Sequence, residues 1–214
     1  MYYTCRNIII NQTPMKKFLI LVLISQFTIL FSQKTYFDED DKIISEKGFN
    51  DRVISYPTLK VCNDSLQKCK IIPTRGEEGT IETDQLFSDL EKSLKIKIDT
   101  AKPTIITFHP GKDRCNSGGT STAHSEFLWH KGKEELSNQV KQSNFFYIYK
   151  DKTNLKSIKK LHWYKDPKNI VENTFFQYHY PCSSYVIIYN NKYLSYFGEF
   201  SQDQVVNDLK TIIK

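Results

Sequence analysis

Residues 184–214 carry the pattern that most constrains the fold, because they read as strand, tight turn, strand, glycine and closing helix. Residues 185–189 are β-branched or aromatic, and Asn190 and Asn191 suit a two-residue hairpin turn. A second strand then runs to Gly198, and a helix with one apolar face follows it. That face would be made of Val205, Val206, Leu209, Ile212 and Ile213. The chain is therefore expected to end in a hairpin covered by a helix.

A basic, apolar and small-residue segment near the other end predicts export. Lys16 and Lys17 precede the apolar stretch 18–31, which a small serine follows. This order is typical of a secretory signal peptide. The stretch is shorter than the roughly 20 residues needed to span a bilayer, so we expect no stable membrane span. We predict a functional start at Met15, a leader and signal peptide at 1–32, and a periplasmic or secreted product after its removal.

The size and charge of the remaining chain favour a single domain. Residues 33–214 suffice for one domain with its own core and a small extension. The formal net charge of the whole chain is +6, and Arg6, Lys16 and Lys17 of the leader contribute to it without a balancing acid. The surplus that remains is too small to indicate nucleic-acid binding. We expect a solvated, mixed-charge surface and a sheet-rich core, because Phe and Tyr are abundant.

Four cysteines remain after the leader: Cys62, Cys69, Cys115 and Cys182. An even number in an oxidising compartment predicts disulfides. The six residues between Cys62 and Cys69 include Asn, Asp and Ser, which favour a turn, so a local hairpin disulfide is expected and Cys115 is left with Cys182. Free thiols or a metal site are the alternatives for the local pair, although its spacing is long for a zinc knuckle.

The rest of the sequence alternates strands and helices. Strands are expected at 53–61, 70–73, 104–108 and 145–149, a loop at 75–79, helices at 84–95 and 125–141, and a weaker helix at 155–161. Residues 34–51 read as a peripheral, charged segment. The run 104–108 is continuously apolar or β-branched, which is typical of a buried central strand.

This order resembles that of the thioredoxin-like fold superfamily over residues 83–214. The resemblance implies an α/β fold, with a mixed central sheet flanked by helices and a small N-terminal extension at 33–82. It also implies that Cys115 lies at the start of the helix after the central strand, near the loop before the penultimate strand, with Ser184 in place of the family's cis-proline. The CxxC motif is absent, because Asn, Ser and Gly follow Cys115. Ordinary dithiol activity is therefore not expected.

Cys115 and Cys182 are the candidate site residues. In a thioredoxin-like fold their loops would meet, and Arg114, Lys112 and a helix N-terminus would stabilise a Cys115 thiolate. The pair would then be a structural bond, a redox-active bond or two unpaired thiols. Two functions follow: an exported thioredoxin-like protein with a thiol-disulfide role, which as an enzyme would be a thiol-disulfide oxidoreductase, or a non-catalytic binding module with structural disulfides. Either would act on a protein partner or a thiol or disulfide substrate, without a cofactor.

Two histidines lie near these cysteines in the sequence. His109 precedes the Cys115 loop and His179 precedes Cys182, and sulfur with imidazole would suit Cu(I) or zinc. The alternation around His179 is explained more simply by packing, so we predict no metal site. The other histidines are interpreted as ordinary exposed residues and the tryptophans as partly buried packing residues: His124, His130, His162, Trp129 and Trp163.

Overall fold

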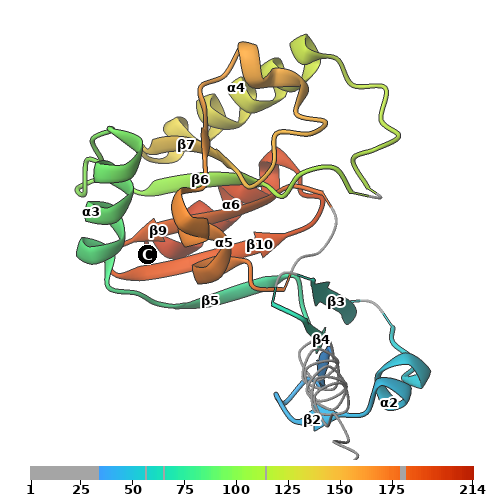
Figure 1. Cartoon of the computed structure of the whole chain (residues 1–214). Helices are drawn as coiled ribbons and strands as arrows, with labels where there is room; N and C mark the ends of the chain where they lie inside the picture. The colour runs from blue at the N-terminus through green and yellow to red at the C-terminus, as the bar shows by residue number, and fades with distance from the viewer. Residues whose placement is uncertain (1–33, 56, 65, 114, 179–181) are drawn as a thin grey trace, which may run out of the picture.

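The computed structural model describes residues 34–55, 57–64, 66–113, 115–178 and 182–214. These residues form an α/β structure with two mixed sheets and five α-helices (Figure 1). The predicted leader and signal peptide at 1–32 lie outside them. Within the described part of the chain, no helix combines the length and the apolar character needed to cross a membrane.

The smaller sheet is built from the first four strands, in the order β2-β1-β4-β3. The strands are β1 (Thr35–Phe37), β2 (Ile43–Ile44), β3 (Leu59–Asn63) and β4 (Lys68–Ile72), with helix α2 (Glu46–Asp51) between β2 and β3. Phe49 of α2 is buried together with Cys69 and Ile71 of β4. The Asn63 side chain also donates a hydrogen bond to the Gln177 carbonyl at 2.7 Å, which ties the hairpin β3–β4 to the rest of the molecule.

The larger sheet has six strands in the order β5-β10-β9-β6-β7-β8. They are β5 (Gly76–Thr80), β6 (Thr104–His109), β7 (Asn144–Tyr149), β8 (Trp163–Lys165), β9 (Ser184–Tyr189) and β10 (Lys192–Phe197). The central strand β6 runs parallel to β7 and antiparallel to β9. Residues 104–108 are buried, as their apolar and β-branched sequence predicts, and the strand continues one residue further to His109, which is buried as well.

Helices cover both faces of this sheet. Helices α3 (Thr83–Leu94) and α5 (Ile170–Phe175) pack on one face, and α4 (Ala123–Val140) and α6 (Gln202–Ile212) cover the other (Figure 1). Side chains of β6 alternate between the two layers, so that Ile106 and Phe108 join α3 and α5. Ile105 packs with α6, and Thr107 contacts α4.

The C-terminal pattern is confirmed in detail. Asn190 and Asn191 have positive φ values of 49° and 60°, as a tight hairpin turn requires, and Gly198 follows with φ 89°. The Ser201 side chain then caps α6 by accepting a hydrogen bond from the backbone N–H of Gln204 at 3.1 Å.

Two other expectations about elements are wrong, and one helix was not predicted. Residues 75–79 were expected as a loop, but β5 pairs with β10 along its whole length, because a distant strand satisfies its backbone groups. The helix expected at 155–161 is only the 3₁₀ turn Lys156–Lys159. Helix α5 was not predicted, because it depends on Asp166, whose carboxylate accepts hydrogen bonds from two of its backbone N–H groups.

Candidate functional site

The structure contains both expected disulfides. Cys62 and Cys69 face each other across β3 and β4, with their Cα atoms 4.0 Å apart. Cys115 and Cys182 are 67 residues apart in sequence, yet their Cα atoms lie 5.3 Å apart. The predicted pairing is therefore confirmed. Disulfides of this kind are compatible with an extracellular location.

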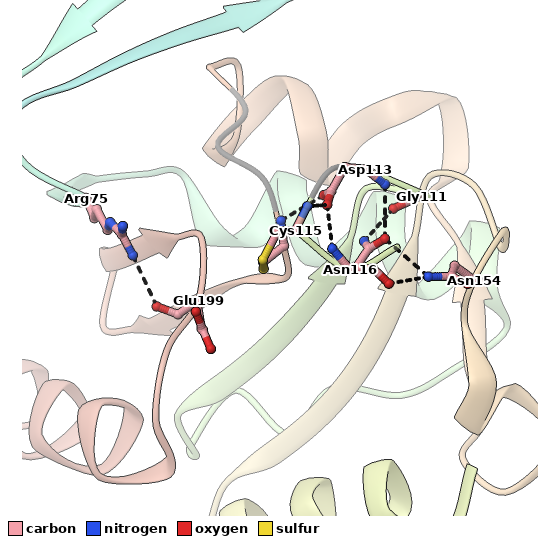
Figure 2. The surroundings of a disulfide bond; sticks show 8 residues. Arg75, Gly111, Asp113, Cys115, Asn116, Asn154 and Glu199 are labelled. Atoms are coloured by element: carbon pink, nitrogen blue, oxygen red, sulfur yellow. Dashed lines mark hydrogen bonds between the residues drawn. A yellow bond between two sulfur atoms is a disulfide. The ribbon is translucent and has the colours of Figure 1, made fainter. Parts of the chain in front are cut away.

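One carboxylate accepts hydrogen bonds from the backbone of both cysteines in the Cys115–Cys182 disulfide. Asp113 Oδ1 accepts hydrogen bonds from the backbone N–H groups of Cys115 at 2.8 Å and Asn116 at 2.9 Å (Figure 2). Its other oxygen, Oδ2, accepts a hydrogen bond from the Cys182 N–H at 2.7 Å. Asp113 thus fixes the two loops to each other independently of the sulfur bridge.

Asn116 adds a second set of contacts to the same loop. Its side-chain amide donates to the Gly111 carbonyl at 2.8 Å, and its Oδ1 accepts from the Asp113 N–H at 3.0 Å (Figure 2). The Asn154 side chain donates to the Asn116 carbonyl. Gly111 has φ 115°, a conformation that side chains disfavour, and its missing Cβ leaves room for Asp151. The loop is therefore ordered by side-chain hydrogen bonds, without regular secondary structure.

The expectation that Cys115 lies at a helix N-terminus is wrong. Helix α4 begins several residues later, at the N-cap Thr122, which forms a capping box with Ser125. Cys115 is exposed and Cys182 is half-buried. Of the two basic residues expected to stabilise a thiolate, Lys112 is exposed and Arg114 lies outside the described residues. The carboxylate that touches both cysteine amides is negative, and a like charge disfavours a thiolate.

The segment before β9 is also unusual. Cys182 has φ 85°, which is rare for a residue other than glycine. Ser184, which the resemblance placed at the family's cis-proline position, is the first residue of β9 and is fully buried, and its Oγ has no hydrogen-bond partner. Strained backbone and unpaired polar atoms are enriched at functional sites.

A cavity of about 250 Å³ adjoins this segment. Cys182 and Ser183 contribute to its lining, so it lies directly beside the disulfide. Most of its large side chains are aromatic: Trp129, His130, Trp163 and Phe200, together with His109. The cavity is thus formed between α4, the strand β8 and the loops at the end of the central strands.

His130 lies at the centre of this aromatic group. It is only 7% exposed, and its ring stands nearly perpendicular to those of Trp129, Tyr147 and Trp163, at centroid distances of 5.0, 4.9 and 5.7 Å. Its Nδ1 atom has no hydrogen-bond partner. Burial, with a smaller contribution from Lys133, holds the pKa of His130 well below its usual value. The expectation that His130 is exposed is wrong, because the buried face of α4 includes it.

Lys133 is a further buried group that the sequence did not indicate. Its side chain is fully buried, its Nζ donates to Thr107 Oγ1, and it lies 5.7 Å from the Trp129 ring centroid and 5.1 Å from that of Tyr147. Burial lowers the pKa of Lys133 to about 7. The only signal in the sequence is spacing: His130, Lys133 and Ser137 recur at helical intervals and are the buried residues of α4.

The histidine ligand pattern considered from the sequence does not assemble a metal site in the described part of the chain. His109 Nε2 lies 3.1 Å from the Thr153 carbonyl, and burial lowers the pKa of this imidazole. His179 lies outside the described residues. No group of three or more His, Cys, Asp or Glu side chains that could hold a metal ion occurs among the residues the structure describes.

No known protein family, no curated protein and no solved structure matches this chain. The function is therefore inferred from the geometry of the disulfide, the Asp113 contacts and the aromatic cavity.

Proposed function

We propose that this protein is an exported, thioredoxin-like binding module whose Cys115–Cys182 disulfide is structural. The fold assignment is supported by the succession β6, α4, β7, β9, β10 and α6, with a parallel pair followed by an antiparallel hairpin. The observation that carries the functional part is the Asp113 carboxylate, which bonds the backbone N–H groups of both cysteines.

The physical argument concerns the thiolates. Reduction by thiol exchange needs an attacking thiolate to approach one sulfur and a second thiolate to leave. The negative charge of Asp113 opposes both, and the N-terminus of α4 does not compensate it, since α4 starts at Ala123. No other thiol follows Cys115 in a CxxC arrangement. A bond that holds two recognition loops in place fits these features better than an exchanging bond.

A thiol-disulfide role for Cys115 and Cys182 is the second candidate. The exposure of Cys115 favours it, because accessible disulfides exchange more readily than buried ones. The positive φ of Cys182 also favours it, since strained backbone is common at reacting groups.

A redox titration separates the two functions. The protein is equilibrated in buffers of defined thiol potential, alkylated, and analysed by peptide mass spectrometry, with Cys62–Cys69 as the internal reference bond. We expect a potential below about −300 mV for Cys115–Cys182, as for structural disulfides. A potential between about −270 and −120 mV would instead establish the redox-active role.

Export is proposed on the signal-like order of residues 16–32 and is compatible with the two disulfides. Mass spectrometry of the mature protein from its native host should find an N-terminus at or near Gln33. An N-terminus at Met1 would contradict both the signal peptide and the start at Met15.

A further inference from the structure

We propose that the cavity beside Cys182 binds a guanidinium group, with Glu199 as its carboxylate partner and aromatic rings as its walls. The proposal rests on the function proposed above, because it names the ligand class that the binding module would recognise. A guanidinium is planar, charged at any physiological pH and weakly hydrated, so it pairs with carboxylates and also packs well on aromatic rings.

The charge at the cavity wall is negative. Glu126 and Glu199 both contribute to the lining, and no lysine or arginine is among the described residues that line it. The Glu126 carboxylate accepts hydrogen bonds from the Ser121 hydroxyl at 3.1 Å and from the Ser157 N–H at 3.0 Å. Both donors are neutral, so these contacts orient Glu126 without cancelling its charge. A cation is therefore the ligand that this wall favours.

Glu199 is the carboxylate that can contact such a ligand directly. It is exposed on the short segment between β10 and α6, and its side chain forms no ion pair or hydrogen bond with any residue that has a described position. The nearby Arg75 guanidinium donates to the Glu199 backbone carbonyl at 3.5 Å, and the Glu199 carboxylate points away from it (Figure 2). Both carboxylate oxygens can thus accept two parallel N–H donors, the pairing that a guanidinium offers.

The aromatic walls favour the same kind of cation. Trp129, Trp163 and Phe200 line the cavity. Aromatic rings attract a cation that lies within about 6 Å of the ring centroid, tryptophan attracts it most strongly, and arginine is the usual cation. The cavity volume of about 250 Å³ lies below the range of about 300–1,000 Å³ typical of drug-sized ligands, so it suits one side-chain-sized group.

The positive groups near the cavity do not outweigh this preference. His109 and His130 line it, but burial lowers the pKa of both imidazoles, so they are neutral at pH 7 and above. Lys156 is already bound to two loop carbonyls, at 3.0 and 2.8 Å. Lys133 lies 5.7 Å from the Trp129 ring centroid, and its burial lowers its pKa to about 7. At pH 8 Lys133 is mostly neutral, which makes this the suitable pH for a test.

Two sources could supply a guanidinium: an arginine side chain of a partner polypeptide, or a free guanidino compound. The shared probe is propylguanidinium, which is the arginine side chain as a free molecule. Propylurea has nearly the same shape without the charge. Butylammonium is the lysine side chain as a free molecule, with a compact and strongly hydrated charge.

The experiment follows the two indole N–H signals by NMR, because the chain has two tryptophans and both line the cavity. Titration of the oxidised protein with propylguanidinium at pH 8 should shift both signals saturably. Propylurea should bind about 10-fold more weakly, because it loses both the ion pair and the attraction of a cation to the rings. Butylammonium should bind about 3-fold more weakly, because it cannot form the paired contact with a carboxylate.

Variants test the role of Glu199. Glu199→Gln keeps the shape of the side chain and removes its charge, so it should weaken propylguanidinium binding about 3- to 5-fold, as for a partly exposed ion pair. Its affinity for propylurea should not change. Glu135→Gln is the matched control, because Glu135 is also exposed but does not line the cavity. It changes the net charge equally and should keep the affinity of the unaltered protein.

Four results would overturn the proposal: no saturable shift with propylguanidinium, equal binding of propylurea, equal or tighter binding of butylammonium, or equal effects of Glu199→Gln and Glu135→Gln. Displacement of propylguanidinium by a short arginine-containing peptide, and not by its citrulline counterpart, would assign the ligand to a partner polypeptide. Binding without such displacement would assign it to a free guanidino compound. The redox titration is independent of these measurements, so failure of the ligand proposal leaves the structural role of the disulfide standing, and the reverse.

Discussion

The two faces of the six-stranded sheet are packed in different ways. The core cluster under α3 and α5 is apolar, with Phe108, Ile106 and Leu90 among its fully buried residues, and the carboxylates of Asp166 and Glu172 are buried at α5 itself. The face under α4 and α6 also buries charged and hydroxyl groups, including Lys133 and Tyr185, whose hydroxyl donates to Asp208. Successive residues of the same strands supply both layers.

This difference suggests a division of roles, in which the apolar core mainly stabilises the fold and the face with buried polar groups carries the cavity. Contacts between apolar side chains, such as those of Phe108, stabilise the fold at any pH, because they contain no group that titrates. Groups such as His130 and Lys133 resist ionisation when buried, so they reduce stability under conditions in which the unfolded chain would take up a proton. The cavity opens on the second face, where the structure places these unfavourable groups together.

The largest expected effect concerns the bond that joins the loops at the cavity. Replacing both Cys115 and Cys182 by serine should reduce the free energy of unfolding by about 4 kcal/mol, because the bond closes a long loop. The Cys62–Cys69 bond closes a much shorter loop, so the matched double replacement of these two cysteines by serine should cost about 2–3 kcal/mol. Urea denaturation of both variants measures the difference. Equal losses would show that loop length does not set the contribution of either bond.

Removal of a ring from the apolar face should have a comparable effect. Phe108 is fully buried and stacks on Phe176 with a centroid distance of 5.1 Å. Phe108→Ala should cost about 3–5 kcal/mol, and the loss should be the same at pH 6 and at pH 9 because nothing in the contact titrates. Thermal or urea unfolding at both pH values checks this. A strongly pH-dependent loss would contradict the separation of the two faces.

The opposite sign is expected for the buried lysine. Lys133→Met should raise the free energy of unfolding at pH 7 by about 1–4 kcal/mol, because it removes a buried group that is partly charged at that pH. The burial that lowers the pKa of Lys133 from 10.5 to about 7 means that the unfolded chain binds more protons between these values. Stability of the unaltered protein should therefore rise from pH 7 toward pH 10, by up to about 1.4 kcal/mol per pH unit from this group.

Urea denaturation over that pH range, with Lys133→Met beside the unaltered protein, measures this contribution. The advantage of the variant should shrink as pH rises toward 10.5, because the folded protein already holds a neutral lysine and the unfolded chain gains less free energy from protonating it. An advantage that stays constant up to pH 10 would mean that packing, and not charge, explains it.

The smallest effect on stability is expected at Asp113. Asp113→Asn retains one oxygen acceptor and loses the negative charge, so it should cost about 1–3 kcal/mol. The rate of reduction of Cys115–Cys182 by dithiothreitol should increase, because the repulsion of the attacking thiolate is removed. The rate for Cys62–Cys69 in the same sample should not change. If neither rate changes, the argument for a structural bond from Asp113 is lost.

The sequence predicts those features that depend on neighbouring residues. The hairpin around Asn190 and the helix capped by Ser201 were found because turn and cap chemistry act within a few positions. Cysteine spacing was also sufficient to pair Cys62 with Cys69. Strand β5 was not predicted because it forms by pairing with β10, which is more than a hundred residues away in sequence.

The cavity could not be predicted for the same physical reason. His130 and Lys133 are polar residues in a helix, and such residues are usually exposed. Their burial depends on Thr107 from β6 and on rings from other strands. The sequence located the loops of Cys115 and Cys182, while the contacts of Asp113 with both loops appear only in three dimensions.

The disulfide between Cys115 and Cys182, which are distant in sequence, also has a mechanical consequence. A force applied at the two ends of the chain cannot extend the segment between Cys115 and Cys182, which are 67 positions apart in sequence, while the bond is intact. Since each extended residue adds about 3.3–3.6 Å, the intact bond prevents the force from extending roughly 220–240 Å of contour length. The segment between the two cysteines contains α4, β7, β8 and α5, and with them Trp129, His130 and Trp163. Stretching the oxidised protein would therefore unravel both ends of the chain and leave most of the aromatic wall inside a covalent ring.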